Sequence, residues 1–414
     1  MIETEHNSGR RAATLLLGLS LVLGMSTWFS ASAVIPQLRP LWDLSDSAAA
    51  WLTISVQLGF VLGALLSSAL NLADIVSART TMLIGATGAA ACNACLLLSN
   101  GAGSAIPLRF GTGFFLAAVY PPAFKLMATW TRQARGTALG LLAGGIALGS
   151  ALPHLVNGLG GLDWRLVVAV TSALTVLGGL VAFGLVREGP FPFPQASFDP
   201  RQIGRVFANR GVRLASLGYF GHMWELFAMW AWFGAFFAAR AASEPGLSSN
   251  SAPLATFAVV GIGAAGCWVG GVLGDRWGRT STTAAMMAAS GLCALTIGLL
   301  FEAPLWLLLV VALVWGFTVI ADSAQFSALV TELADQAYVG TALTFQLAIG
   351  FSLTVATIWL VPKLETALTW RWAFAFLAPG PALGVMAMLR LKSLPEAARL
   401  AHAPLDPAGS AGRS

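Results

Sequence analysis

Charged side chains are scarce in this chain. They make up 10% of its 414 residues, whereas a soluble domain averages roughly 25%. Hydrophobic residues, in contrast, account for 57%. A chain with so few charges and so much apolar surface is not an ordinary soluble enzyme or binding module. We therefore expect an integral membrane protein whose surroundings are the lipid bilayer.

Cysteine and histidine are also rare, with four residues of each. Every cysteine falls inside an apolar run, which argues against a disulfide framework. The histidines show neither H-x-x-x-H spacing nor a Ser/His/Asp constellation, so a metal centre and a membrane-embedded enzyme are both disfavoured. A G-x-x-x-x-G-K-[ST] motif is absent too, which disfavours ATP-driven pumping. We expect no cofactor, no metal site and no enzymatic activity.

Apolar runs of about 20 residues, the length of a membrane-spanning helix, fill most of the sequence. Each run predicts one transmembrane helix, and nothing else of domain size remains. The twelve runs lie at approximately 12–36, 47–71, 80–99, 103–128, 135–158, 164–187, 209–239, 252–275, 280–300, 303–329, 338–362 and 371–392.

A polar stretch at roughly 188–208 separates the first six runs from the last six. Pro190, Pro192 and Pro194 prevent a helix from continuing through it. The tail after the last run is rich in proline and alanine, which favours disorder. The predicted organisation is an N-terminal six-helix bundle at 1–187, a cytoplasmic linker at 188–208, a C-terminal six-helix bundle at 209–392 and a disordered cytoplasmic tail at 393–414.

Basic residues predict the orientation, because Lys and Arg are retained on the cytoplasmic side of a membrane. Placing both termini in the cytoplasm puts 17 of the 23 Lys and Arg residues on that side. The formal charge of +5 is spread over short loops, so orientation explains it and a nucleic-acid partner is not expected. We expect a multi-pass protein of the inner (cytoplasmic) membrane with both termini cytoplasmic.

The two halves of the chain repeat each other. Residues 135–139, 163–165 and 72–74 return in the same order as 339–343, 369–371 and 273–275, each about 200 residues later. Parallel repeats of this kind are typical of transporters. The predicted fold is therefore an all-α membrane protein with twelve transmembrane helices in two pseudo-symmetric six-helix bundles. Since one chain supplies both halves, we expect it to function as a monomer.

This layout resembles the major facilitator superfamily over about residues 12–392. Residues 271–279, between helices 8 and 9, are similar to the family's G-x-L-x-D-R-x-G-R loop. The equivalent loop at 70–79 keeps an acid but loses both glycines. The resemblance implies transport by alternating access, with the loops latching the outward-open state. The alternative is simple positive-inside anchoring. The implied latch residues are Asp74, Asp275, Arg276 and Arg279.

Two further stretches bear on the subfamily. Residues 27–30 and 222–225 are similar to bacterial cyanate and nitrate/nitrite porters, but 47–71 and 252–274 lack the Arg residues with which those porters hold an anion. Helix 5 carries glycine at 136, 140 and 144 and at 145 and 149, a spacing that lets another helix approach closely. Drug–proton antiporters of the family have a proline where Gly145 stands, which weakens the efflux interpretation.

Charged groups inside predicted spans are costly and are therefore candidates for function. Glu225 lies about 18 Å into helix 7, with His222 one turn away on the same face. The two could share a proton, or they could form a buried hydrogen bond that holds helix 7 to a neighbour. Asp322 in helix 10 could bind substrate, take a proton or cap a broken helix segment. The resemblance implies that Arg109 supports proton transfer, although it could also snorkel outward.

The family places helices 1, 4, 7 and 10 around a central cavity. Cavity candidates in this sequence are Trp28, Ser30, Gln57, Trp224 and Gln346. The sequence thus predicts a secondary active transporter that moves a small solute by alternating access and is coupled to protons. Two alternatives stay open: a proton-driven efflux antiporter for drugs or amphiphiles, and a non-transporting membrane sensor on the same fold.

Overall fold

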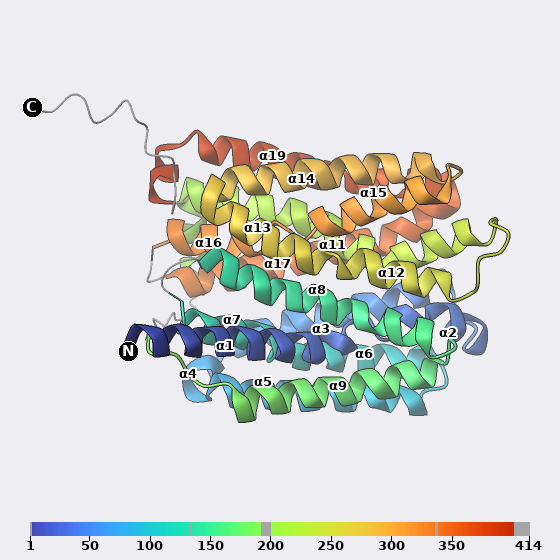
Figure 1. Ribbon diagram of the computed structural model, residues 1–414, viewed down its shortest axis with the longest axis horizontal. Coiled ribbons are helices and arrows are strands. Elements are labelled where there is room, and N and C mark those ends of the chain that lie inside the picture. The colour runs from blue at the N-terminus through green and yellow to red at the C-terminus, as the bar shows by residue number, and fades with distance from the viewer. Residues whose placement is uncertain (1, 132–134, 192–199, 336–337, 401–414) are drawn as a thin grey trace, which may run out of the picture.

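The computed structural model describes residues 2–131, 135–191, 200–335 and 338–400, and every regular element in them is helical (Figure 1). The side chains of 2–8, 73, 74, 135, 200, 398 and 399 lie outside this description. The long helices run along one common direction. Elements up to α9 occupy one half of the molecule and those from α11 onward the other (Figure 1). We call the end at which α1 begins and α19 ends the termini face. The predicted all-α fold with two six-helix bundles is confirmed.

Most of the predicted spans correspond to one helix, and several correspond to a pair of helices separated by a short break. In the first bundle these are α1 (Ile2–Gly24) with α2 (Ile35–Leu41), α3 (Asp46–Ala69), α5 (Ala78–Ala94), α6 (Ala102–Leu116) with α7 (Tyr120–Ala128), α8 (Arg135–Leu159) and α9 (Trp164–Leu185). In the second they are α11 (Arg210–Ala241), α12 (Ser251–Gly261) with α13 (Gly263–Trp277), α14 (Arg279–Thr296), α15 (Leu305–Thr318) with α16 (Ser323–Leu333), α17 (Val339–Leu368), and α18 (Trp370–Ala373) with α19 (Pro379–Lys392).

Length and hydropathy agree with twelve membrane-spanning segments. In the described residues, ten helices are long and apolar enough to cross a bilayer, and the pair Gly9–Thr27 and Ser32–Leu41, bent by 49°, can be counted as an eleventh. Helix α11 is the twelfth: it is 32 residues long. It falls outside that count, and it carries Arg213, His222 and Glu225 along its length. Two of the predicted proton-coupling residues, His222 and Glu225, therefore lie on this helix.

Three of the interrupted spans contain no helix for three or four residues. The helix is lost at 28–31 in the first span, at 117–119 in the fourth and at 319–322 in the tenth. In the fourth span, Pro121 and Pro122 have no N–H to donate to the carbonyls four residues earlier, which explains the break. The fourth and tenth spans break about 200 residues apart, at equivalent points of the two repeats.

The glycines of α8 face two different helices. A Cβ atom at Gly140 or Gly144 would collide with the backbone of α13, at Cys267 and Ala264. A Cβ atom at Gly149 would instead collide with the backbone of α1. The predicted close helix approach is confirmed, and α8 packs tightly against its own bundle on one side and against the opposite bundle on the other.

The predicted linker and tail contain some regular structure. A 3-10 helix at Pro200–Gln202 and α10 (Ile203–Ala208) lie within the linker. Another 3-10 helix, Pro395–Arg399, lies where the disordered tail was expected to begin, and the following Leu400 is buried. A tail disordered from residue 393 is therefore wrong, because these residues pack. The remaining linker and tail residues, 192–199 and 401–414, lie outside the described residues.

Candidate functional site

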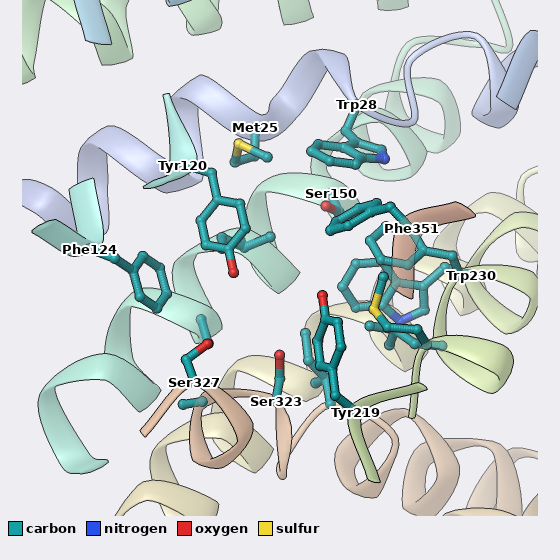
Figure 2. Close-up of a pocket in the computed structure, with 17 residues that line it drawn as sticks. Met25, Trp28, Tyr120, Phe124, Ser150, Tyr219, Trp230, Ser323, Ser327 and Phe351 are labelled. Atoms are coloured by element: carbon teal, nitrogen blue, oxygen red, sulfur yellow. The ribbon is translucent and has the colours of Figure 1, made fainter. Parts of the chain in front are cut away.

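A cavity lies between the two bundles, with an empty volume of about 590 Å³ that includes open space at its mouth, and both bundles line it (Figure 2). The interrupted helices supply much of its wall, because each break places side chains at mid-depth. Trp28 belongs to the break in the first span, Tyr120 follows the break in the fourth, and Ser323 follows the break in the tenth. Helix α11 presents one continuous face to the cavity, from Tyr219 to Trp230.

Five of the lining residues carry a hydroxyl group, and one of them, Ser150, belongs to α8. The hydroxyls of Tyr120 and Tyr219 reach toward each other from α7 and α11, and Ser323 and Ser327 approach from α16 (Figure 2). The chain contains only three tyrosines, and two of them are here. None of the seventeen described lining residues is Lys, Arg, His, Asp or Glu. The cavity therefore offers neutral hydrogen-bond donors and acceptors and no charge.

An aromatic layer closes one end of the cavity. Trp28 and Phe60 from the first bundle pack against Phe227 and Phe351 from the second, with Trp28–Phe60, Trp28–Phe227 and Phe60–Phe351 centroid distances of 5.0, 5.7 and 4.6 Å. Phe29 and Trp230 extend the layer, 5.9 Å apart between ring centroids. Rings at these distances exclude water and hold the bundles together at this level.

The opposite end of the cavity continues toward the termini face. A second cavity, with an empty volume of about 1080 Å³, shares Tyr120, Phe124, Tyr219 and Ser327 with the first. Helices α7, α16 and α17 also line this second cavity. Lys125, Glu332 and Val339 lie near the ends of these helices at the termini face, and Gln346 lies further along α17. The central cavity therefore leads toward the termini face rather than toward the opposite end.

His222 and Asp322 meet directly behind the cavity wall. The His222 Nδ1 atom lies 2.9 Å from the Asp322 Oδ1 atom, and both side chains are almost fully buried. Asp322 immediately precedes α16, at the interruption of the tenth span, and its neighbour Ser323 lines the cavity. Tyr219, which lines the cavity, lies beside His222, with a centroid distance of 6.1 Å between the two rings. His222 and Asp322 are therefore next to lining residues, but neither of them lines the cavity.

Glu225 is engaged elsewhere. Its carboxylate accepts hydrogen bonds from the Ser290 hydroxyl at 2.9 Å and from the Trp315 indole N–H at 2.7 Å. It is 1% exposed and does not line the cavity. The predicted His222–Glu225 pair is therefore wrong, because neighbouring helices supply other partners to each residue. Of the two alternatives for Glu225, the structure favours a buried hydrogen bond that joins α11 to α14 and α15.

Arg109 does not snorkel outward: it is fully buried and holds the interrupted first span in place. Its guanidinium donates to the carbonyl oxygens of Thr27 and Trp28, where the helix is lost, and to that of Leu52 on α3. It also donates to Ser30 Oγ and Asn93 Oδ1, both at 3.1 Å. Every acceptor that the described residues give it is neutral. Arg109 therefore supplies the hydrogen bonds that the broken helix cannot supply itself.

Asp275 joins the two bundles at the termini face. Its carboxylate accepts hydrogen bonds from the backbone N–H groups of Gly136 and Thr137, at 3.2 and 2.9 Å, and from the Thr137 hydroxyl at 2.8 Å. These two residues begin α8, so an acid from one bundle caps a helix of the other. The contact is present while the cavity leads toward this same face.

The other predicted latch residues differ in their surroundings. Arg279 is buried and donates to Glu332 at 2.7 Å and to Gln325 at 3.0 Å, both on α16 of its own bundle. Arg276 is exposed. Asp74 lies in the short helix α4 (Leu72–Ile75), and its side chain falls outside the described residues.

The predicted cavity residues lie at different places in the structure. Trp28 lines the central cavity and Gln346 the second one. Ser30 does not line either cavity, because Arg109 and Asn93 occupy its hydroxyl. Trp224 points to the far side of α11, where its N–H donates to the Phe376 carbonyl at 3.3 Å. Gln57 is fully buried outside both linings. Tyr120 and Tyr219 were not predicted to line the cavity, although the scarcity of tyrosine in the chain could have drawn attention to them.

Comparisons with known proteins agree with this architecture. The family model of the Major Facilitator Superfamily matches residues 16–357. An uncharacterised transporter of Saccharomyces cerevisiae, ESBP6, is 28% identical over 240 residues, which is 54% of this chain and 34% of that protein. The chain therefore spans about a third of the length of this curated relative.

Two solved structures share the fold at low sequence identity. A D-xylose–proton symporter superposes with a TM-score of 0.73 at 17% identity, covering 94% of this chain and 98% of the symporter. A bacterial homologue of the human lysosomal transporter Spinster, in an inward-facing and unoccupied conformation, gives a TM-score of 0.64 at 15% identity, covering 92% and 95%.

Proposed function

The chain belongs to the major facilitator superfamily, a family of transporters, and on this premise we propose that it moves a small solute by alternating access, coupled to protons. The observation that carries the proposal is the cavity between the bundles, closed at one end by aromatic rings and backed by the buried His222–Asp322 pair. Nothing in the family or the fold points to an enzyme.

Alternating access needs a site that both bundles build and that opens to one side at a time. The aromatic layer closes one end while the second cavity leads away from the other, which supports such a cycle. We further propose that the protein lies in the inner membrane with both termini cytoplasmic, that the linker joins two bundles at 1–187 and 209–392, and that a monomer suffices. In that orientation the described state faces the cytoplasm.

Proton coupling is supported by the position of His222 and Asp322. Histidine and carboxylate side chains inside membrane-spanning segments are the groups that form proton relays in pumps and transporters. Asp322 lies at the interruption of the tenth span, so a change in its charge would act on a helix junction next to the solute. One structural neighbour is itself a proton symporter, which adds to this support.

Proton movement in proteoliposomes tests the proposal. The purified protein is reconstituted with a trapped pH dye and challenged in turn with small organic acids, neutral organic solutes, amino acids and lipophilic cations. We expect at least one class to evoke proton movement that protein-free liposomes lack. If folded protein exchanges solute without proton movement, coupling is wrong. If it moves neither, the sensor alternative is favoured.

Removing the Asp275 contact is expected to loosen the termini face. Asp275→Ala deletes three hydrogen bonds between the bundles, which should favour the more open conformation by about 2 kcal/mol, roughly a thirtyfold change in population. Spin labels at the exposed residues Ile75 and Trp277 would report the change as a longer distance. The neighbouring exposed residue gives a matched control, Arg276→Ala, which should leave the distance unchanged. Equal distances in both variants would contradict the latch.

Efflux of an amphipathic compound is the second candidate function. The apolar and aromatic lining of the cavity favours it, whereas the glycine at position 145 departs from the antiporter pattern. The sign of the proton movement separates the two functions: a symporter carries protons with the added solute, and an antiporter carries them in the opposite direction.

A further inference from the structure

We infer that the central cavity binds an uncharged organic solute with a ring-sized apolar body and a hydrogen-bonding group that includes an acceptor. The inference rests on the proposed function, since it names the class of solute that this cavity would carry. It draws on three properties of the lining: the absence of charge, the distribution of aromatic surface and the presence of buried donors without partners.

The lining excludes an ionic solute. An ion that leaves water for a buried cavity needs an opposite charge or several strong hydrogen bonds in return. The seventeen described lining residues supply no ionisable acid or base of the Asp, Glu, Lys, Arg or His type. His222 and Asp322 contact each other behind the wall, and Arg109 is occupied by five acceptors at the first-span break. A neutral solute avoids this cost.

Aromatic surface concentrates at one end of the cavity. Trp28, Phe227, Trp230 and Phe351 stand at the closed end, whereas the hydroxyls gather around Tyr120, Tyr219 and the α16 serines (Figure 2). This division fits a solute whose body is an apolar ring with few polar groups. A sugar presents hydroxyls all around its ring, and the aromatic end would leave many of them without partners.

Three buried donor groups of the lining have no partner among the described residues. They are the indole N–H groups of Trp28 and Trp230 and the hydroxyl of Ser150. An indole nitrogen can donate but cannot accept. Buried polar groups are nearly always satisfied, so unpaired groups beside a cavity indicate an occupant that supplies the missing atoms. That occupant must carry a hydrogen-bond acceptor, such as a carbonyl oxygen.

Three ring-matched probes test the inference: para-fluorobenzamide, para-fluorobenzoate and para-fluorobenzylammonium. The first is neutral, the second is an anion and the third is a cation. Each probe is added to the full chain in lipid nanodiscs, and broadening of its fluorine NMR line reports binding. We expect broadening for the neutral amide only, with no displacement by excess D-xylose. Three results would overturn the inference. They are binding of either ion as tightly as the amide, displacement of the amide by D-xylose, and binding of none of the three probes.

A double variant places the binding in this cavity. Tyr120→Phe with Tyr219→Phe removes two hydroxyls but keeps both rings, and we expect about tenfold weaker amide binding. The matched control is Trp306→Phe, because Trp306 is 66% exposed and far from the lining. Unchanged binding in the double variant would assign the probe to another site and overturn the inference. The NMR binding assay uses no proton gradient, so its result is independent of the pH-dye assay. Amide binding without proton movement would refute proton coupling but not the solute class. Proton movement without amide binding would refute the solute class but not proton coupling.

Discussion

Asp322→Asn is expected to abolish solute-driven proton movement while leaving solute exchange across the membrane intact. The asparagine amide has nearly the shape of the carboxylate, but it cannot take up a proton. It would still face His222 Nδ1, now 2.9 Å from Asp322 Oδ1, so the cavity wall should keep its form. Proton flux should therefore fall to the level of protein-free liposomes, and counterflow of labelled solute should continue. The pH-dye assay and a counterflow assay on the same preparation measure the two results.

Glu225→Gln provides the comparison. Glu225 is as buried as Asp322, but it is held by Ser290 and Trp315 and is absent from the cavity lining. We expect this variant to keep proton-coupled transport and to lose one hydrogen bond, with a stability cost of about 1–3 kcal/mol. Loss of proton flux in folded Glu225→Gln together with normal flux in Asp322→Asn would move the coupling site from Asp322 to Glu225.

Arg109→Met is expected to have the largest effect on stability. Methionine has similar length but no N–H groups, so five acceptors lose their donor inside the first bundle. A buried acceptor that loses its donor typically costs about 1–3 kcal/mol, and several acceptors are affected here. The break at residues 28–31 should lose its support, and Trp28 should leave its place in the aromatic layer. Thermal unfolding in detergent would show the loss as a lower melting temperature.

Two further substitutions make this result interpretable. Arg109→Lys keeps the charge but supplies three donors from one nitrogen, so an intermediate stability is expected. Arg39→Met removes an exposed arginine whose ion pair with Asp46 lies at the surface, and it should change stability by less than about 1 kcal/mol. If Arg109→Met and Arg39→Met have the same melting temperature, the hydrogen bonds of Arg109 do not stabilise the first span.

The helices and their order were predictable because the bilayer imposes strict rules. A span must be apolar for about 20 residues and must satisfy its own backbone hydrogen bonds. Even α11, which carries Arg213, His222 and Glu225, was found from its sequence. The close packing of α8 followed from the spacing of Gly140, Gly144 and Gly149, since only glycine leaves room for a neighbouring backbone.

The direction in which a side chain points was much harder to predict. Trp224 and Tyr219 lie on the same helix, yet only Tyr219 reaches the cavity, because a helix with apolar residues on all sides gives no signal of which face meets water. The partners of His222 and Glu225 come from other helices, and local spacing says nothing about them. The role of Arg109 depended on a helix break that contains no proline and was invisible in the sequence.

The glycine faces of α8 bear on how fast the two bundles can move relative to each other. Where α8 meets α13, backbone lies against backbone, and hardly any side chain projects into the contact near Gly140 and Gly144. A surface without side chains has no rotamers to rearrange when it slides, so it adds little to an activation barrier. The rings of the aromatic layer must instead separate from one another before that end can open. Most of the activation barrier to opening should therefore come from separating the rings of the aromatic layer. The contact between α8 and α13 should add little to this barrier while it keeps the two helices aligned.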